Sequence, residues 1–213
     1  MSKLGDIKTR IATAAKQSGR NVNDITLIAV SKNRTPEQIS ALIAEGQMVF
    51  GENRVQEAQE KFPPLKEKHQ NLQLHFIGHL QSNKAKEAIA LFDMIHSIDR
   101  PSVAEAAAKE MHRQNRNLPC FIQVNTGEEA QKGGISPRET EQLLITCRET
   151  LGMNIIGLMC IPPEKDIPDL HFALLHKMAR DFNLPHLSMG MSADVESAIR
   201  FGATYVRIGS ALF

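Results

Sequence analysis

The chain has 213 residues, of which 42% are hydrophobic, and its 25 Lys and Arg against 24 Asp and Glu give a formal net charge of +1. This length and apolar content predict a single domain over residues 1–213 with a sizeable buried core. The small net charge provides no strong field for a polyanion, which disfavours nucleic acids and anionic membranes as partners.

Targeting and redox features are those of a cytoplasmic protein. The start, MSKLGDIKTR, lacks the charged-then-apolar layout of a signal peptide, and no apolar run approaches the roughly 20 residues that span a bilayer. The three cysteines, Cys120, Cys147 and Cys160, are odd in number and lie within apolar segments. We therefore expect buried, reduced thiols rather than disulfides or zinc ligands.

The first predicted elements are a helix over residues 2–19 and a strand over residues 24–31. Leu4, Ile7 and Ile11 follow helical spacing, and Gly19 is placed to end the helix. The apolar run DITLIAVS continues through adjacent positions, which is typical of a strand buried on both faces in a parallel sheet.

Helices and strands then alternate to the end of the chain. Thr35-Pro36 with Gln38 forms a capping signal for the next helix, and KFPPLKEK is interpreted as a loop that ends the helix starting near residue 54. The further predicted strands are 48–51, 72–78, 94–98, 120–125, 154–161, 186–190 and 204–209. The further predicted helices are 83–92, 102–114, 137–151, 169–182 and 193–202.

Eight strand–helix units predict an α/β fold, a single (β/α)₈ barrel of the TIM type, in preference to an open doubly wound sheet. No helix follows the last predicted strand, whereas one helix precedes the first strand. We therefore expect the N-terminal helix to cover the seam between the first and last strands.

Lys32 lies where the first strand ends, at the face of a barrel that carries active sites. If Ile28 and Val30 point inward, the period of two sends Lys32 inward as well. Partial desolvation there would disfavour the ammonium and free an amine for Schiff-base chemistry. The alternative is a lysine that extends to water at a strand end, and this segment alone does not decide between them.

Two segments near the C-terminus are candidate anion sites. In SMGMSADVESAI, the N–H and hydroxyl of Ser192 can meet an anion at the positive end of a helix, although an ordinary N-cap is the alternative and Asp194 would oppose an anion. In VRIGSALF, Gly209 and Ser210 offer further backbone donors. The loops after strands seven and eight often form the phosphate site of such barrels, so we predict a phosphate here.

Arg207 precedes Gly209 by two residues and can point to the barrel mouth, although a buried ion pair is the alternative. A lysine, a phosphate site and an arginine together predict a pocket for an aldehyde that carries a phosphate. Pyridoxal phosphate is the common biological example of such a molecule.

Five segments spread from residue 29 to 213 resemble the pyridoxal phosphate homeostasis protein family: AVSK, FGENRVQE, HFIGHLQSNK, SMGMSADVESAI and VRIGSALF. The resemblance implies a monomeric barrel of the alanine racemase type, pyridoxal phosphate fold type III, without that enzyme's second β domain. It also implies a Schiff base between the cofactor and Lys32. By motif matching, Asn53 should lie beside the cofactor ring and Arg207 near the pyridine nitrogen, with three residues around the phosphate: Ser192, Gly209 and Ser210.

Other polar residues have simpler interpretations. Without the resemblance, Asn53 would be interpreted as a turn or cap residue. Lys84 is expected on a solvated face and Lys132 in a flexible loop, so neither is placed in the site. His75 and His79 follow no zinc-binding pattern, and no metal is expected.

Three functions remain compatible with the sequence: a cofactor-binding homeostasis protein, an amino-acid racemase or similar enzyme, and a Schiff-base aldolase. An aldolase would share the lysine and the phosphate site, but it would have no use for an arginine at a ring nitrogen. The related racemase uses a tyrosine from the domain that is missing here, and we expect Tyr205, the single tyrosine, in the core, which leaves Lys32 as the only group placed for proton transfer. We therefore predict a pyridoxal phosphate carrier that contacts apo-enzymes transiently and has no robust catalysis.

Overall fold

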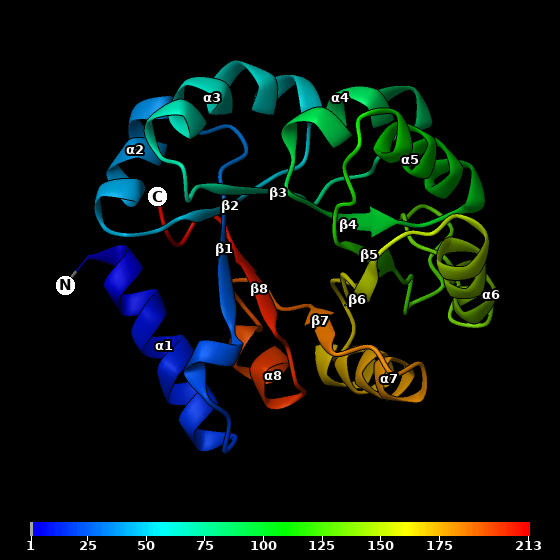
Figure 1. The fold of residues 1–213 in the computed structure, drawn as a ribbon. Coiled ribbons are helices and arrows are strands. Elements are labelled where there is room, and N and C mark those ends of the chain that lie inside the picture. Colours follow the sequence, from blue (N-terminus) through cyan, green and yellow to red (C-terminus); the bar gives the residue numbers. More distant parts are fainter. Residues whose placement is uncertain (1) are drawn as a thin grey trace.

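Eight parallel strands close into a barrel in sequence order, with β8 hydrogen-bonded to β1 (Figure 1). This computed structural model describes residues 2–213. The closed parallel sheet confirms the predicted barrel. Its strands are β1 (Thr26–Val30), β2 (Val49–Glu52), β3 (Gln73–Phe76), β4 (Met94–Ile98), β5 (Cys120–Gln123), β6 (Ile155–Met159), β7 (His186–Ser188) and β8 (Tyr205–Ile208).

One helix precedes the barrel and one helix connects each pair of successive strands. None of the helices within residues 2–213 is both long and apolar enough to cross a membrane. They are α1 (Lys3–Gln17), α2 (Pro36–Ala44), α3 (Val55–Lys68), α4 (Ala85–Leu91), α5 (Pro101–Arg113), α6 (Thr140–Ile145), α7 (Pro168–Asp181) and α8 (Val195–Arg200). Single 3₁₀ turns cover Val22–Asp24 and Ser82–Lys84, and a π-helical turn, Thr146–Thr150, extends α6.

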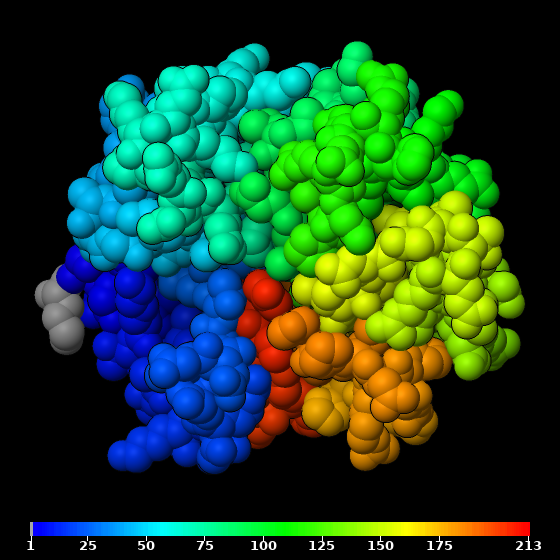
Figure 2. All heavy atoms as spheres, viewed as in Figure 1, coloured from blue at the N-terminus to red at the C-terminus, as the bar shows by residue number. Residues whose placement is uncertain are grey.

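Helix α1 packs beside α8 and covers the seam where β8 meets β1, as the sequence predicts. Its buried side chains include Leu4, Ile7 and Ile11, the residues that follow the helical spacing. Arg10 of α1 donates two hydrogen bonds to the carboxylate of Glu196 in α8, at 2.7 and 3.0 Å. In Figure 2 the red C-terminal strand lies between the blue N-terminal segment and the orange segment, which shows how the two ends of the chain complete the wall.

Helix α3 continues through KFPPLKEK, so the predicted loop at this segment is wrong. Pro63 and Pro64 lack the backbone N–H, and a proline inside a helix typically costs about 3 kcal/mol. Burial of the flanking side chains offsets this cost, because Phe62 is fully buried and Leu65 is nearly so. The end of the helix is also fixed by Lys66, whose ammonium lies 2.7 Å from a carboxylate oxygen of Asp93.

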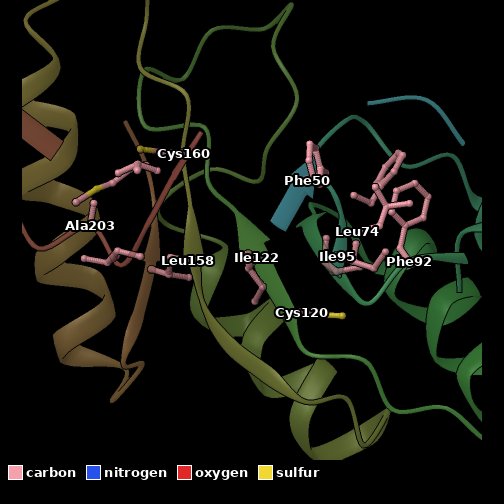
Figure 3. Packing of buried hydrophobic residues seen from close by; sticks show 14 of the residues in the cluster. Phe50, Leu74, Phe92, Ile95, Cys120, Ile122, Leu158, Cys160 and Ala203 are labelled. Carbon is pink, nitrogen blue, oxygen red and sulfur yellow. The ribbon is translucent and has the colours of Figure 1, made fainter. Parts of the chain in front are cut away.

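The apolar core lies mainly between the outer face of the barrel wall and the helices. Alternate strand residues point outward into this layer, and Figure 3 shows Phe50, Leu74, Ile95, Ile122 and Leu158 within it. A small apolar cluster separates from this layer: Met94, Phe121 and Met159. The strands therefore present their apolar side chains chiefly to the helices.

The cysteines are buried, reduced thiols, as predicted. Burial raises the pKa of the Cys147 thiol to about 11 and that of Cys160 to about 12, and it also raises the pKa of Cys120. Thiols with raised pKa values are poor nucleophiles near neutral pH.

Candidate functional site

A cavity of about 700 Å³ opens at the carboxyl ends of the strands. All six residues that the sequence nominates lie along its wall, although they come from four separate parts of the chain. They are Lys32, Asn53, Ser192, Arg207, Gly209 and Ser210.

Lys32 lies in the turn that follows β1, two residues beyond the end of the strand. The turn is closed by the Arg34 N–H, which donates to the Ser31 carbonyl at 3.0 Å. The side chain lines the cavity, but the residue is exposed. The expected partial desolvation is therefore wrong for the chain alone, because the strand ends at Val30 and the turn lifts Lys32 to the mouth.

A buried charge cluster holds this turn from below. The ammonium of Lys61 donates to the Ser31 carbonyl at 2.8 Å and lies 2.7 Å from Glu52 and 2.8 Å from Glu57. Glu57 also accepts the Asn33 N–H at 2.5 Å. Burial raises the pKa of Glu52, and the hydrogen bond from Lys61 opposes this shift. The cluster therefore fixes the backbone on both sides of Lys32.

Asn53 follows β2 and presents an unsatisfied acceptor. Its Oδ1 atom is buried and has no hydrogen-bond partner among residues 2–213. A Cβ on Gly78 would lie only 2.2 Å from the Asn53 carbonyl oxygen, so glycine permits this close approach. Leaving a buried acceptor unpaired typically costs about 1–3 kcal/mol, and a ligand donor would relieve that cost.

Arg207 is a buried guanidinium on the cavity wall, with 4% of its surface exposed. Its Nη1 donates to the Ser188 hydroxyl at 2.8 Å, and its Nη2 donates to the Cys160 carbonyl at 2.9 Å. Neutral groups hold it, so the alternative of a buried ion pair is wrong. Burial lowers the pKa of Arg207, but a guanidinium stays protonated in proteins.

Ser192 occupies a different position from the one expected. Helix α8 begins at Val195 with Asp194 as its N-cap, and the Asp194 carboxylate accepts the Met191 N–H at 2.6 Å. The acidic residue thus caps the turn, which places Ser192 in the loop before the helix rather than at its positive end. Its carbonyl accepts a hydrogen bond from Arg10 at 3.1 Å.

Backbone donors face open space in the loops after β7 and β8. Within the described part of the chain, the N–H groups of Ser192, Gly209 and Ser210 donate to no acceptor. A Cβ on Gly209 would have Val30 as its nearest neighbour, at 3.6 Å, so the packing of the chain does not itself require glycine there. Free N–H groups beside unfilled space fit an anionic group.

Sequence reasoning missed His79 and Gln123, which also line the cavity. The His79 Nδ1 atom lies 3.3 Å from an Asp99 carboxylate oxygen, and the Gln123 amide donates to the Gly133 carbonyl at 3.1 Å. A second side chain that can carry a proton therefore lies at the cavity besides Lys32, which was expected to be the only group placed for proton transfer. The available signal was position, since His79 follows a strand end just as Lys32 does.

Lys84 and Lys132 are not among the residues that line the cavity. Lys132 is held by Glu129 at 2.7 Å and by the Pro162 carbonyl at 3.2 Å. No group of three or more His, Cys, Asp or Glu side chains between residues 2 and 213 could hold a metal ion.

Comparison with known proteins identifies the family. The model of the alanine racemase N-terminal domain matches residues 3–213. The pyridoxal phosphate homeostasis protein of Aquifex aeolicus is 40% identical over 220 residues, which cover 99% of this chain and 96% of that protein. The chain belongs to the pyridoxal phosphate homeostasis protein family. The family member from Escherichia coli K12 is 37% identical over 219 residues, covering 99% and 94% of the two chains.

A solved structure of a similar protein has the same fold. PipY of Synechococcus elongatus without pyridoxal phosphate superposes with a TM-score of 0.87 at 35% identity, covering 97% of this chain and 99% of that one. PipY with pyridoxal phosphate bound gives a TM-score of 0.81 at 33% identity, covering 95% and 99%. The resemblance seen in the five sequence motifs is thus confirmed at the level of family and fold.

Proposed function

We propose that this chain is a cytoplasmic carrier of pyridoxal 5′-phosphate that holds the cofactor reversibly as a Schiff base on Lys32. The observation that supports this most is the meeting of an amine, a buried guanidinium and free backbone N–H groups in one cavity. PipY, which shares the fold, binds the same cofactor.

Lys32 is the attachment point in this proposal. Bound pyridoxal phosphate supplies an aldehyde, and condensation with an amine forms a C=N bond while the carbonyl oxygen leaves as water. The exposure of Lys32 keeps the amine accessible to the aldehyde and the bond accessible to water. Easy entry and release suit a carrier better than an enzyme that retains its cofactor.

The remaining residues have separate roles. Asn53 lies beside the ring, where its Oδ1 accepts a hydrogen bond from the cofactor. Arg207 donates to the pyridine nitrogen, and a cation there favours the unprotonated ring, which is a weak electron sink. Ser192, Gly209 and Ser210 bind the phosphate through N–H and hydroxyl donors.

A racemase is the second candidate, and one observation favours it: His79 lines the cavity beside Asp99. Two-sided proton transfer needs an acid and a base on opposite faces of the substrate. Tyr205 does not serve, because its ring packs edge-to-face against His96 and Phe121 in the barrel interior. The loaded protein should incorporate no appreciable solvent deuterium at the α position of alanine, and rapid incorporation that is lost in His79→Ala would support the racemase.

The test of cofactor binding is an absorption titration of purified protein with pyridoxal phosphate. The unsubstituted chain and a Lys84→Ala control should both develop a visible band, and Lys32→Ala should not. A band that persists in Lys32→Ala would contradict the attachment, and no band in the unsubstituted chain would contradict the function.

The carrier role is tested by mixing the loaded protein with an apo pyridoxal phosphate enzyme. We expect activation that is slower than activation by the same concentration of free cofactor, because release from Lys32 must come first. No activation would contradict delivery while leaving storage, and activation as fast as with free cofactor would contradict retention by Lys32.

A further inference from the structure

A chain of hydrogen bonds runs from the cavity wall into the barrel interior. Arg207 of β8 donates to the Ser188 hydroxyl of β7 at 2.8 Å, and this hydroxyl lies 2.8 Å from Nδ1 of His96 in β4. The Nε2 atom of His96 lies 3.1 Å from Nδ1 of His75 in β3. All four side chains are more than nine-tenths buried.

The chemistry of these groups fixes the direction of the chain. Burial lowers the pKa of His96 and lowers that of His75 to about 4, so both rings are neutral at pH 7 and each has one donor and one acceptor. A guanidinium can only donate, so the Ser188 oxygen accepts from Arg207. Among the described residues the Ser188 hydrogen has no acceptor other than Nδ1 of His96, so it points to that atom. The His96 ring then carries its hydrogen on Nε2 and donates to His75.

Every hydrogen bond of this chain therefore points away from the cavity, with the negative ends of the dipoles toward Arg207. Such an arrangement stabilises a buried cation without a carboxylate, which would otherwise neutralise it and compete for its donors. Among residues 2–213, two of the five guanidinium N–H groups find acceptors, the Ser188 hydroxyl and the Cys160 carbonyl. The others stay free for a ligand.

Packing holds the imidazole in place. The His96 ring stacks on Phe121 with centroids 4.4 Å apart and meets the edge of Tyr205 at 5.7 Å. The titratable or charged groups that face Arg207 are His96, the Cys160 thiol and the Asp194 carboxylate. These groups lie in β4, directly after β6 and at the N-cap of α8.

We propose that Ser188 and His96 are positioning residues for Arg207, which they orient so that its free N–H donors face the acceptor ring nitrogen of the bound cofactor. The inference rests on the proposed function and extends it. The oriented network selects a ligand with an unprotonated nitrogen at this point, and it resists protonation of that nitrogen as the pH falls.

Ser188→Ala and Ser97→Ala form a matched test. Both serines are fully buried in strands of the barrel, Ser188 in β7 and Ser97 in β4, but the Ser97 hydroxyl has no partner among the described residues. Ser188→Ala should weaken pyridoxal phosphate binding by about tenfold or more, as expected for a lost hydrogen bond to a charged group. It should also shift the pH midpoint of the visible band, which a merely structural role would not move. Ser97→Ala should match the unsubstituted chain in both measurements.

The inference is overturned if Ser188→Ala and Ser97→Ala give the same affinity and the same pH midpoint. Loss of the fold in Ser188→Ala would also contradict a role limited to positioning, and thermal unfolding of the cofactor-free variants detects it. Failure of the proposed function is distinguishable, because the unsubstituted chain would then show no visible band at all.

A second pair of variants acts on the imidazole. His96→Asn retains an acceptor for the Ser188 hydroxyl, whereas His96→Leu removes it. We expect the Asn variant to bind pyridoxal phosphate at least about threefold more tightly than the Leu variant. Equal affinity in two folded variants would contradict the role of His96.

Discussion

The two faces of the barrel wall differ in chemistry although they are built from alternate residues of the same strands. Leu74 and Val206 point outward into the apolar layer, and their neighbours His75 and Arg207 point inward. Burial of the outward residues stabilises the fold. Of the inward residues, Arg207 places hydrogen-bond donors at the cavity. One strand thus carries stability and function on opposite sides.

Glu52 is an exception, because it is a fully buried carboxylate on the outward side of β2. It pairs with Lys61 of α3 beneath the turn that carries Lys32. The outer layer therefore includes a deeply buried ion pair, and that pair supports the turn that carries Lys32.

The largest expected effect is in the apolar layer. Phe50→Ala removes a fully buried ring and should lower the free energy of unfolding by about 3–5 kcal/mol. Phe182→Ala, at a partly buried position, should lower it by less. Denaturant unfolding measures both values. If the outer face carries stability and the inner face function, folded Phe50→Ala should still develop the visible band with pyridoxal phosphate, and its loss would contradict that separation.

Two lysines of α3 test the contribution of the buried Lys61–Glu52 pair to stability. Lys61→Met leaves Glu52 buried without its cation and should cost about 3 kcal/mol or more of unfolding free energy. Lys66→Met removes the more exposed pair with Asp93 and should cost about 1 kcal/mol or less. Similar losses in the two variants would show that burial of the Lys61 pair has no special effect.

The interior histidines predict a dependence of stability on pH. An unfolded histidine binds a proton below a pKa of about 6.5, whereas folded His75 does so only near 4, so the unfolded state binds more protons between these values. Stability should be complete above pH 6.5 and fall by about 3 kcal/mol from His75 alone as the pH approaches 4. Urea unfolding across this range should show a smaller slope for His75→Gln, but not for the exposed control His112→Gln. An unchanged slope in His75→Gln would contradict this origin.

The smallest expected effect is in the loops after β7 and β8, where we propose that the phosphate binds. Ser210→Ala should weaken pyridoxal phosphate binding by about 1.5 kcal/mol, because the backbone N–H donors remain. Binding of pyridoxal, which lacks the phosphate, should not change. Fluorescence or absorption titrations with the two ligands separate these outcomes, and equal weakening for both would place Ser210 away from the phosphate.

The barrel could be predicted from sequence because strand and helix signals depend on residues close together in the chain. The same is true of the position of Lys32 after an apolar run. Helix α3 could not be predicted through Pro63 and Pro64, because the burial that compensates for them is a tertiary effect. The position of Ser192 was missed because Asp194 competes as the cap.

The hydrogen bonds inside the barrel could not be predicted from the sequence for a related reason. His96 and Ser188 are 92 positions apart, and only the register of β4 and β7 in the closed barrel brings them together. Single histidines and serines within strands carry no signal of such pairing. Five of the six nominated residues, by contrast, follow strand ends, and the sixth, Arg207, is the second-last residue of β8. A barrel gathers such positions at one face.

Borohydride reduction of the loaded protein followed by peptide mass mapping tests the central claim most directly. Reduction converts a C=N bond to a stable amine and so marks the lysine that held the cofactor. We expect the pyridoxyl group mainly on the peptide that contains Lys32, with minor labelling of exposed lysines that condense with free aldehyde. A label found mainly on another lysine, such as Lys84 or Lys132, would contradict the account.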